Sequence, residues 1–263
     1  MTSARSTLLA ASSVYGQCAK RVEANITATS WLSEASSERI IGLGIARDWV
    51  SRAACMDTIK FTSGRMNRSA RTPSFLEIIR YGFAWSGINA IFSRNDLLHL
   101  AGTPKSDSEI ERFKLLFRAA ALPTTLISAR ESTLHAILSE QTVTRLPLAA
   151  PGTAVSTLHA INAKYVPLGA RIKGTGKKIS EAASNGNLGV LDLPTLLYAF
   201  RNWSVHGSAL DGSFGGRPKF NAFLKILNDS LAEVHLNTAS FLLRLLCCVG
   251  PLGRRCGNPS HTI

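Results

Sequence analysis

Hydrophobic side chains recur along this chain at intervals of three and four residues, and no segment alternates apolar and polar residues for long. The clearest case lies between residues 73 and 93. The large hydrophobic residues there are Phe75, Ile78, Tyr81, Trp85, Ile88 and Phe92. Such intervals place the side chains on one face of an α-helix, whereas a half-buried strand requires strict alternation. We therefore expect an all-α fold.

Helix start signals precede two further segments. Overlapping capping boxes in SDSEIE (residues 106–111) predict a helix that runs to residue 119. Asp192 is a typical N-cap, and Pro194 suits the first turn of the helix that would follow it. The apolar stripe of this second helix would consist of Leu193, Leu196, Leu197 and Phe200. Both segments are predicted to be amphipathic helices.

The remaining helical signals differ in strength. A stripe near the C-terminus predicts a final helix of about 28 residues, interrupted in its spacing only at Thr238. The stripe consists of Phe220, Leu224, Leu227, Leu231, Val234, Phe241 and Leu245. Weaker helical patterns cover 37–61, 123–147 and 153–166. Residues 1–30 lack clear periodicity, and we expect them to be irregular or loosely helical.

The acid-free stretch TSGRMNRSARTP at residues 62–73 reads as a linker. It suggests that residues 1–72 form an N-terminal helical extension with a basic linker. Residues 73–250 would then form the main helical bundle, and 251–263 a C-terminal tail.

The chain is strongly basic, with 30 Lys and Arg against 17 Asp and Glu and a formal net charge of +13. Nucleic acid, an anionic lipid surface or an acidic protein would each be attracted by this charge. Twenty of the cations are arginine, which binds phosphate in a bidentate manner and mildly favours nucleic acid among these partners. Two acid-free clusters contain the candidate RNA-binding residues: Arg65, Arg68, Arg71, Lys173, Lys177 and Lys178. The alternative is that both clusters are exposed connectors.

Several common classes of site lack support in the sequence. The five cysteines form no CxxC pair, which argues against a zinc site or a disulfide framework and favours a reducing, cytoplasmic location. RIKGTGKKIS (171–180) lacks two fixed positions of a phosphate-binding loop, and GLGIAR (42–47) lacks the third glycine of a dinucleotide site. No GxSxG or HExxH motif occurs, and no apolar run is long enough to span a membrane. We expect no metal and no cofactor.

The stretch LLYAFRNWSVHGSAL (196–210) places Arg201, Asn202 and His206 at the end of an apolar helical run, directly before Gly207. A cation and a glycine are ordinary ways to end a helix. The stretch also resembles the RNxxxHG form of the Rx4–6H signature of HEPN domains. FAWSGINAIF (83–92) is similar to the aromatic-rich first core helix of several HEPN families. The resemblance covers roughly residues 73–246.

This resemblance implies a bundle of four or five core helices, commonly dimeric, and in many members a metal-independent ribonuclease. Arginine five residues before histidine also occurs at 94–99 and 130–135, but neither is followed by glycine. The first of these also follows the presumed first core helix, where HEPN domains do not carry the signature. Arg201 is suited to bind the scissile phosphate and His206 to transfer protons, while Asn202 would orient the imidazole or hold phosphate.

The resemblance also implies that two signatures face each other across a homodimer. A role as a toxin or defence effector, restrained by an antitoxin or another regulatory protein, would be in keeping with many HEPN proteins. Two alternatives remain open. One is a HEPN-fold protein that binds RNA or nucleotide without cutting it, and the other is a basic helical adaptor for an acidic partner.

Overall fold

The computed structural model describes residues 3–28, 33–58, 73–93, 108–139, 192–205 and 217–248. Throughout these ranges the regular structure is α-helical, which confirms the all-α expectation. The helices are α1 (Ala4–Ala28), α2 (Ser33–Cys55), α4 (Pro73–Phe92), α6 (Glu109–Ala119), α7 (Thr124–Ser139), α10 (Leu193–Val205) and α11 (Arg217–Cys248). The candidate linker at 62–72 and the weak helix at 153–166 lie outside the described residues.

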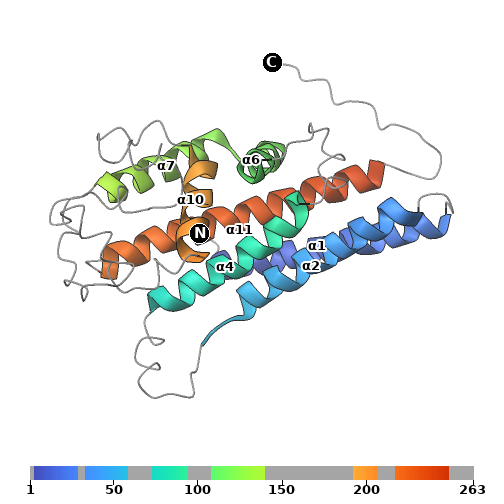
Figure 1. The fold of residues 1–263 in the computed structure, drawn as a ribbon, viewed down its shortest axis with the longest axis horizontal. Helices are drawn as coiled ribbons and strands as arrows, with labels where there is room; N and C mark the ends of the chain where they lie inside the picture. The colour runs from blue at the N-terminus through green and yellow to red at the C-terminus, as the bar shows by residue number, and fades with distance from the viewer. Residues whose placement is uncertain are drawn as a thin grey trace.

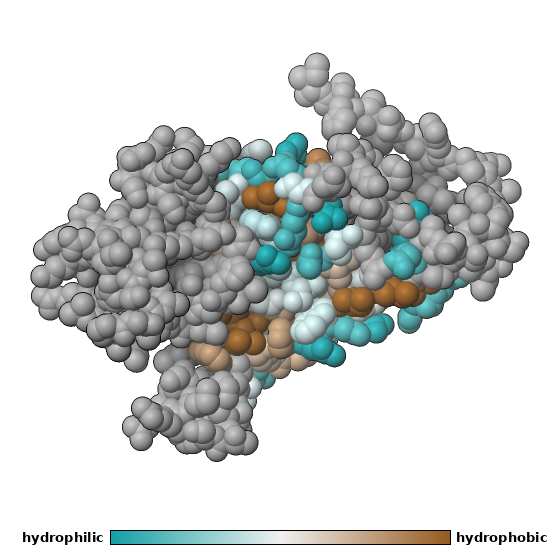
Figure 2. Space-filling model, in the orientation of Figure 1, coloured by the Kyte–Doolittle hydropathy of each residue, from teal (hydrophilic) through white to brown (hydrophobic). Residues whose placement is uncertain are grey.

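The four longest helices pack side by side (Figure 1). Helix α1 contacts α2 and α11, and α4 contacts α2 and α11. The shorter helices α6 and α7 contact α11 and lie above it in Figure 1, and α10 crosses over α11 in that view. Helices α6 and α10 contact each other and also α4. The buried core contains side chains from both sides of the domain boundary that we expect near residue 72, among them Tyr15, Leu43, Tyr81 and Leu231. The described residues at 3–28 and 33–58 therefore supply part of the same core as the bundle that follows. On the face seen in Figure 2, the described residues are a mixture of hydrophilic and hydrophobic ones.

Helix α1 is longer and more regular than the sequence suggests, with 25 residues where we expect an irregular or loosely helical segment. Five of its buried residues follow intervals of three and four: Leu8, Ala11, Tyr15, Cys18 and Val22. Two of the five are small, and this weakens the hydrophobic signal in the sequence. The small side chains allow close approach of neighbouring helices, and the helix is stabilised mainly by this packing rather than by local preference.

The strongest sequence signals agree with the observed helices. Helix α4 matches the segment predicted at 73–93, and α11 contains the predicted final helix, with Thr238 buried on its stripe. Helix α6 begins one residue after Ser108, which occupies the N-cap position without a capping hydrogen bond from its side chain. The weak pattern at 123–147 corresponds to α7 in its first part.

The C-terminal end of α2 is held by two arginines from neighbouring helices. The side chain of Arg80 in α4 is buried and donates from Nε to the carbonyl oxygen of Ala53 at 3.1 Å and from Nη2 to that of Met56 at 2.8 Å. Arg5 in α1 donates from Nε to the carbonyl oxygen of Ala54 at 2.9 Å. The last carbonyls of a helix lack intrahelical partners, so these contacts satisfy them and fix α2 against α1 and α4.

A buried histidine joins three of the long helices. His235 in α11 lies 2.7 Å by Nε2 from the carbonyl oxygen of Ala84 in α4, and 3.1 Å by Nδ1 from the hydroxyl of Tyr15 in α1. Because a carbonyl oxygen only accepts, Nε2 must donate. In the neutral ring Nδ1 then accepts from the tyrosine O–H. Burial lowers the pKa of His235 to about 4, so the ring stays neutral at neutral pH.

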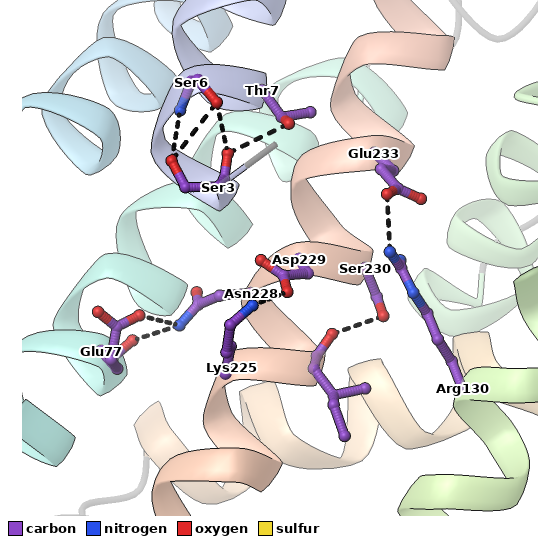
Figure 3. A network of polar contacts seen from close by, with 11 residues as sticks. Ser3, Ser6, Thr7, Glu77, Arg130, Lys225, Asn228, Asp229, Ser230 and Glu233 are labelled. Carbon is purple, nitrogen blue, oxygen red and sulfur yellow. Dashed lines mark hydrogen bonds and ion pairs between the residues drawn. The ribbon is translucent and has the colours of Figure 1, made fainter. Parts of the chain in front are cut away.

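Around this histidine the helices leave little space. A Cβ at Gly87 in α4 would lie 2.8 Å from Cγ2 of Val50 in α2 and 3.2 Å from Cε1 of His235. Glycine is therefore the residue that lets α4 approach α2 and α11 at this point. Nearby on α11, Asn228 donates from Nδ2 to the backbone oxygen and to Oε2 of Glu77 in α4 (Figure 3). Helices α4 and α11 are thus joined by polar contacts as well as by packing.

Candidate active site on helix α10

Helix α10 carries Arg201 and is anchored at its N-terminal end by carboxylates. Asp192 accepts at Oδ1 from the backbone N–H of Thr195 at 3.0 Å, which confirms the predicted N-cap. Glu131 in α7 accepts from the backbone N–H of Leu193 at 2.6 Å. Lys114 in α6 forms an ion pair with Asp192 at 3.3 Å. Negative charge is favourable at a helix N-terminus, so these contacts stabilise α10 and set its direction.

The predicted apolar stripe of α10 faces the core, with Leu193, Leu196, Leu197 and Phe200 all buried. The ring of Phe200 packs edge-on against Tyr81 in α4, with ring centroids 4.8 Å apart. Tyr81 donates its hydroxyl to the backbone oxygen of Leu197 at 2.6 Å. Burial raises the pKa of Tyr81 well above its usual value, with Arg201 opposing that rise, so the phenol remains a donor.

Arg201 lies on the side of α10 that faces α6. Its Nη2 is 3.2 Å from Oε1 of Glu109, the first residue of α6. The other carboxylate oxygen of Glu109 accepts from the hydroxyl of Tyr198 at 3.1 Å. The guanidinium carbon of Arg201 also lies 5.8 Å from the centroid of the Tyr198 ring, within the range of a cation–π contact. One carboxylate therefore holds two neighbouring side chains of α10.

The side chain of Arg201 remains 24% exposed and that of Glu109 28% exposed. A guanidinium in this position is fixed in direction yet can be reached by an anion from solvent. Planar guanidinium groups bind phosphate oxygens through paired N–H donors, so Arg201 can bind a phosphodiester at the edge of α6 and α10.

The other predicted site residues are only partly covered by the structure. The backbone of Asn202 belongs to α10, but its side chain and all of His206 lie outside the described residues. The six basic residues predicted to bind RNA also lie outside: Arg65, Arg68, Arg71, Lys173, Lys177 and Lys178. Of the predicted site, the structure thus locates the Arg201 side chain and the helix that carries it.

The segment at 130–135 offers a comparison within the described residues, because it repeats the spacing of Arg201 and His206. Arg130 in α7 forms an ion pair with Glu233 in α11 at 2.7 Å (Figure 3), and its side chain is only 11% exposed. This arginine joins two helices and is less accessible than Arg201. The spacing at 94–99 lies outside the described residues.

Glu109 and Tyr198 are the site residues that sequence reasoning missed. The sequence indicates Glu109 only as part of a capping box. No sequence pattern connects it with Tyr198, which lies 89 residues further along the chain. Tyr198 precedes Arg201 by three residues, a spacing that places both on one side of a helix, and this is the signal that could have identified it.

Two further observations concern the described residues. They contain no group of three or more His, Cys, Asp or Glu side chains placed to hold a metal ion. Nor does any helix within these ranges have the length and apolar character needed to cross a membrane.

Comparisons with models of protein families, with curated proteins and with solved structures give no match for this chain.

Proposed function

We propose that this protein is a metal-independent endoribonuclease of the HEPN type. The observation that carries the proposal is the placement of Arg201. Its guanidinium is held by Glu109 and Tyr198 yet remains 24% exposed, and Arg201 begins an RNxxxHG sequence whose first five residues belong to α10 in an all-α protein. The equivalent arginine at 130 is only 11% exposed and forms an ion pair with Glu233 in α11 instead.

The chemistry follows from the two side chains. Attack of an RNA 2′-OH on the adjacent phosphorus requires removal of the hydroxyl proton and protonation of the leaving 5′-oxygen. Imidazole has an unperturbed pKa near neutrality, so His206 suits these proton transfers. The guanidinium of Arg201 would stabilise the charge that develops on the phosphorane. Asn202 would orient the imidazole or hold the phosphate.

A single chain supplies only one histidine to this site. Residues five apart on a continuous helix are also separated by about 140° around its axis. Our proposal therefore includes a homodimer, in which two copies of α10 face each other and two arginines and two histidines surround one phosphate. The basic residues at 65–71 and 173–178 would flank this cleft and bind the RNA backbone. A toxin or defence role, with an antitoxin or another regulatory protein as partner, suits such an activity.

Incubation of the purified protein with labelled single-stranded RNA in EDTA tests this proposal. We expect products that end in a 2′,3′-cyclic phosphate and a 5′-hydroxyl, because the 2′-oxygen replaces the leaving 5′-oxygen. Arg201→Ala and His206→Ala should each abolish detectable cleavage. His135→Ala is the matched control, since it removes a histidine with the same spacing from arginine on α7, and it should cleave like the wild type.

The other outcomes select the alternatives. RNA retention at low salt without cleavage would identify a non-catalytic RNA-binding protein, with nucleotide binding as a second assay. No retention of RNA would favour an adaptor for an acidic protein. Cleavage that is lost in EDTA would contradict the metal-independent mechanism.

Mixing inactive subunits tests the composite site. A heterodimer of Arg201→Ala and His206→Ala subunits retains one arginine and one histidine. If the two subunits share a site, the mixture should recover measurable cleavage while each variant alone has none. Activity of an isolated wild-type monomer would contradict the dimeric arrangement.

A further inference from the structure

We infer that Glu109 is a positioning residue for Arg201. It lowers the affinity of the protein for RNA and raises the rate at which bound RNA is cleaved. This inference rests on the proposed function and adds to it a residue from a different helix. Its basis is the contact of both carboxylate oxygens of Glu109 with α10, one with Arg201 at 3.2 Å and the other with Tyr198 at 3.1 Å.

The geometry explains the effect on rate. A free arginine side chain samples many rotamers, and a catalytic group must be held near its productive direction to stabilise a transition state. Here the guanidinium is restrained from two sides, by the Glu109 carboxylate and by the Tyr198 ring. The Tyr198 hydroxyl in turn fixes the second carboxylate oxygen. Removal of the carboxylate charge would release Arg201 from this arrangement.

The charges explain the effect on affinity. Glu109 places a negative charge within contact distance of the cation that would bind phosphate. An RNA phosphate at Arg201 is therefore repelled by the carboxylate, and this repulsion is present in the ground state. Because the pair is partly exposed, solvent screens its attraction, and this favours access of a phosphate to the same guanidinium.

Charge elsewhere on α6 supplies a matched control. Glu111 lies in the same first turn as Glu109, and its side chain is exposed. Replacement of either glutamate by glutamine removes one negative charge from the same helix end, so net charge changes equally and the change in the helix-dipole interaction is similar. A difference between the two variants then reports the contact with α10.

The test measures RNA binding and single-turnover cleavage for Glu109→Gln and Glu111→Gln. We expect Glu109→Gln to bind single-stranded RNA several-fold more tightly and to cleave it about tenfold more slowly at saturation. Glu111→Gln should cleave at the wild-type rate, with a smaller gain in affinity. The extra affinity gain of Glu109→Gln should disappear when Arg201 is also replaced by alanine. Thermal unfolding of both variants should be similar, so that a folding defect does not account for the split.

The results separate the two proposals. Equal rates and affinities for Glu109→Gln and Glu111→Gln, in a wild type that cleaves and needs Arg201, would overturn this inference and leave the ribonuclease proposal intact. An affinity gain that persists without Arg201 would also overturn it. A wild type that does not cleave RNA would overturn the proposed function and this inference with it.

Discussion

The two sides of this molecule use polar side chains in different ways. Among the four long helices, His235 is fully buried, neutral and bonded to two other helices. On the side of α6 and α10, Arg201 and Glu109 are charged and partly exposed. The contacts of His235 fix three helices against one another, because separating them would leave a buried polar group without a hydrogen-bond partner, which costs free energy. The ion pair of Arg201 and Glu109 contributes little to stability and keeps charge within reach of a ligand. We therefore expect substitutions on the two sides to affect different measurements.

The largest loss of stability should come from the buried face of α11. Leu231 is completely buried, whereas Leu9 in α1 is 47% exposed. Leu231→Ala should lower the free energy of unfolding by about 2–5 kcal/mol, through lost burial and the cavity that remains. Leu9→Ala is the control and should change it by less than about 1 kcal/mol. Urea denaturation measures both, and similar values for the two variants would contradict the assigned core.

Acid should weaken the contact between the long helices. The pKa of His235 is about 4 in the folded protein and near 6.5 when the chain is unfolded, so the unfolded state binds a proton first as pH falls. Stability contributed by this group is complete above pH 6.5 and is lost as pH falls from 6.5 towards 4, by about 3 kcal/mol.

The check is the free energy of unfolding as a function of pH, with His235→Gln as the comparison. Other titrating groups contribute to both proteins, so the difference between the two curves isolates His235. We expect the variant to be less stable at pH 7 and to lose less stability on acidification. Parallel curves would show that the buried neutral histidine does not account for the acid sensitivity.

The close approach at Gly87 should give an intermediate effect. Gly87→Ala places a methyl group against Val50 and His235, and overpacking of this kind costs about 1–3 kcal/mol. At Gly82, on the same helix, an added Cβ would have no atom of another helix within 4 Å. Gly82→Ala should therefore stabilise the protein slightly, by up to about 1 kcal/mol, through its better helix propensity. Thermal unfolding measures both variants. If Gly87→Ala and Gly82→Ala shift the melting temperature in the same direction, the close packing at Gly87 is contradicted.

The smallest change in stability should come from the other side of the molecule. Glu109→Gln breaks a partly exposed ion pair, so we expect a loss of less than about 1 kcal/mol in the free energy of unfolding. The same substitution should produce the change in RNA cleavage described above. A large loss of stability would show that this pair belongs to the structural core, and the contrast between the two sides would then fail.

The sequence predicts helices well where large hydrophobic residues form the stripe. Tyr81 and Trp85 in α4 and Leu227 and Leu231 in α11 are buried as their spacing indicates. In α1 the stripe includes Ala11 and Cys18, and small side chains are a weak signal because they are buried or exposed with little difference in transfer free energy. The pattern there becomes clear only when the neighbouring helices are known.

The candidate site is predictable only in part, for a related reason. Arg201 and Tyr198 share one side of α10 through their spacing, which sequence reveals. The partner Glu109 is 89 residues away from Tyr198 along the chain, and its position depends on how α6 packs against α10. A glutamate in the first turn of α6 is favourable because of the helix dipole, without any reference to Arg201. Tertiary contacts of this kind have no local signature.

The most direct test of our account is the rate of RNA cleavage in EDTA by the wild type, His206→Ala and His135→Ala. We predict that the wild type and His135→Ala cleave at the same rate and that His206→Ala has no detectable activity. Equal cleavage by His206→Ala and the wild type, or no cleavage by any of the three, would contradict the central claim.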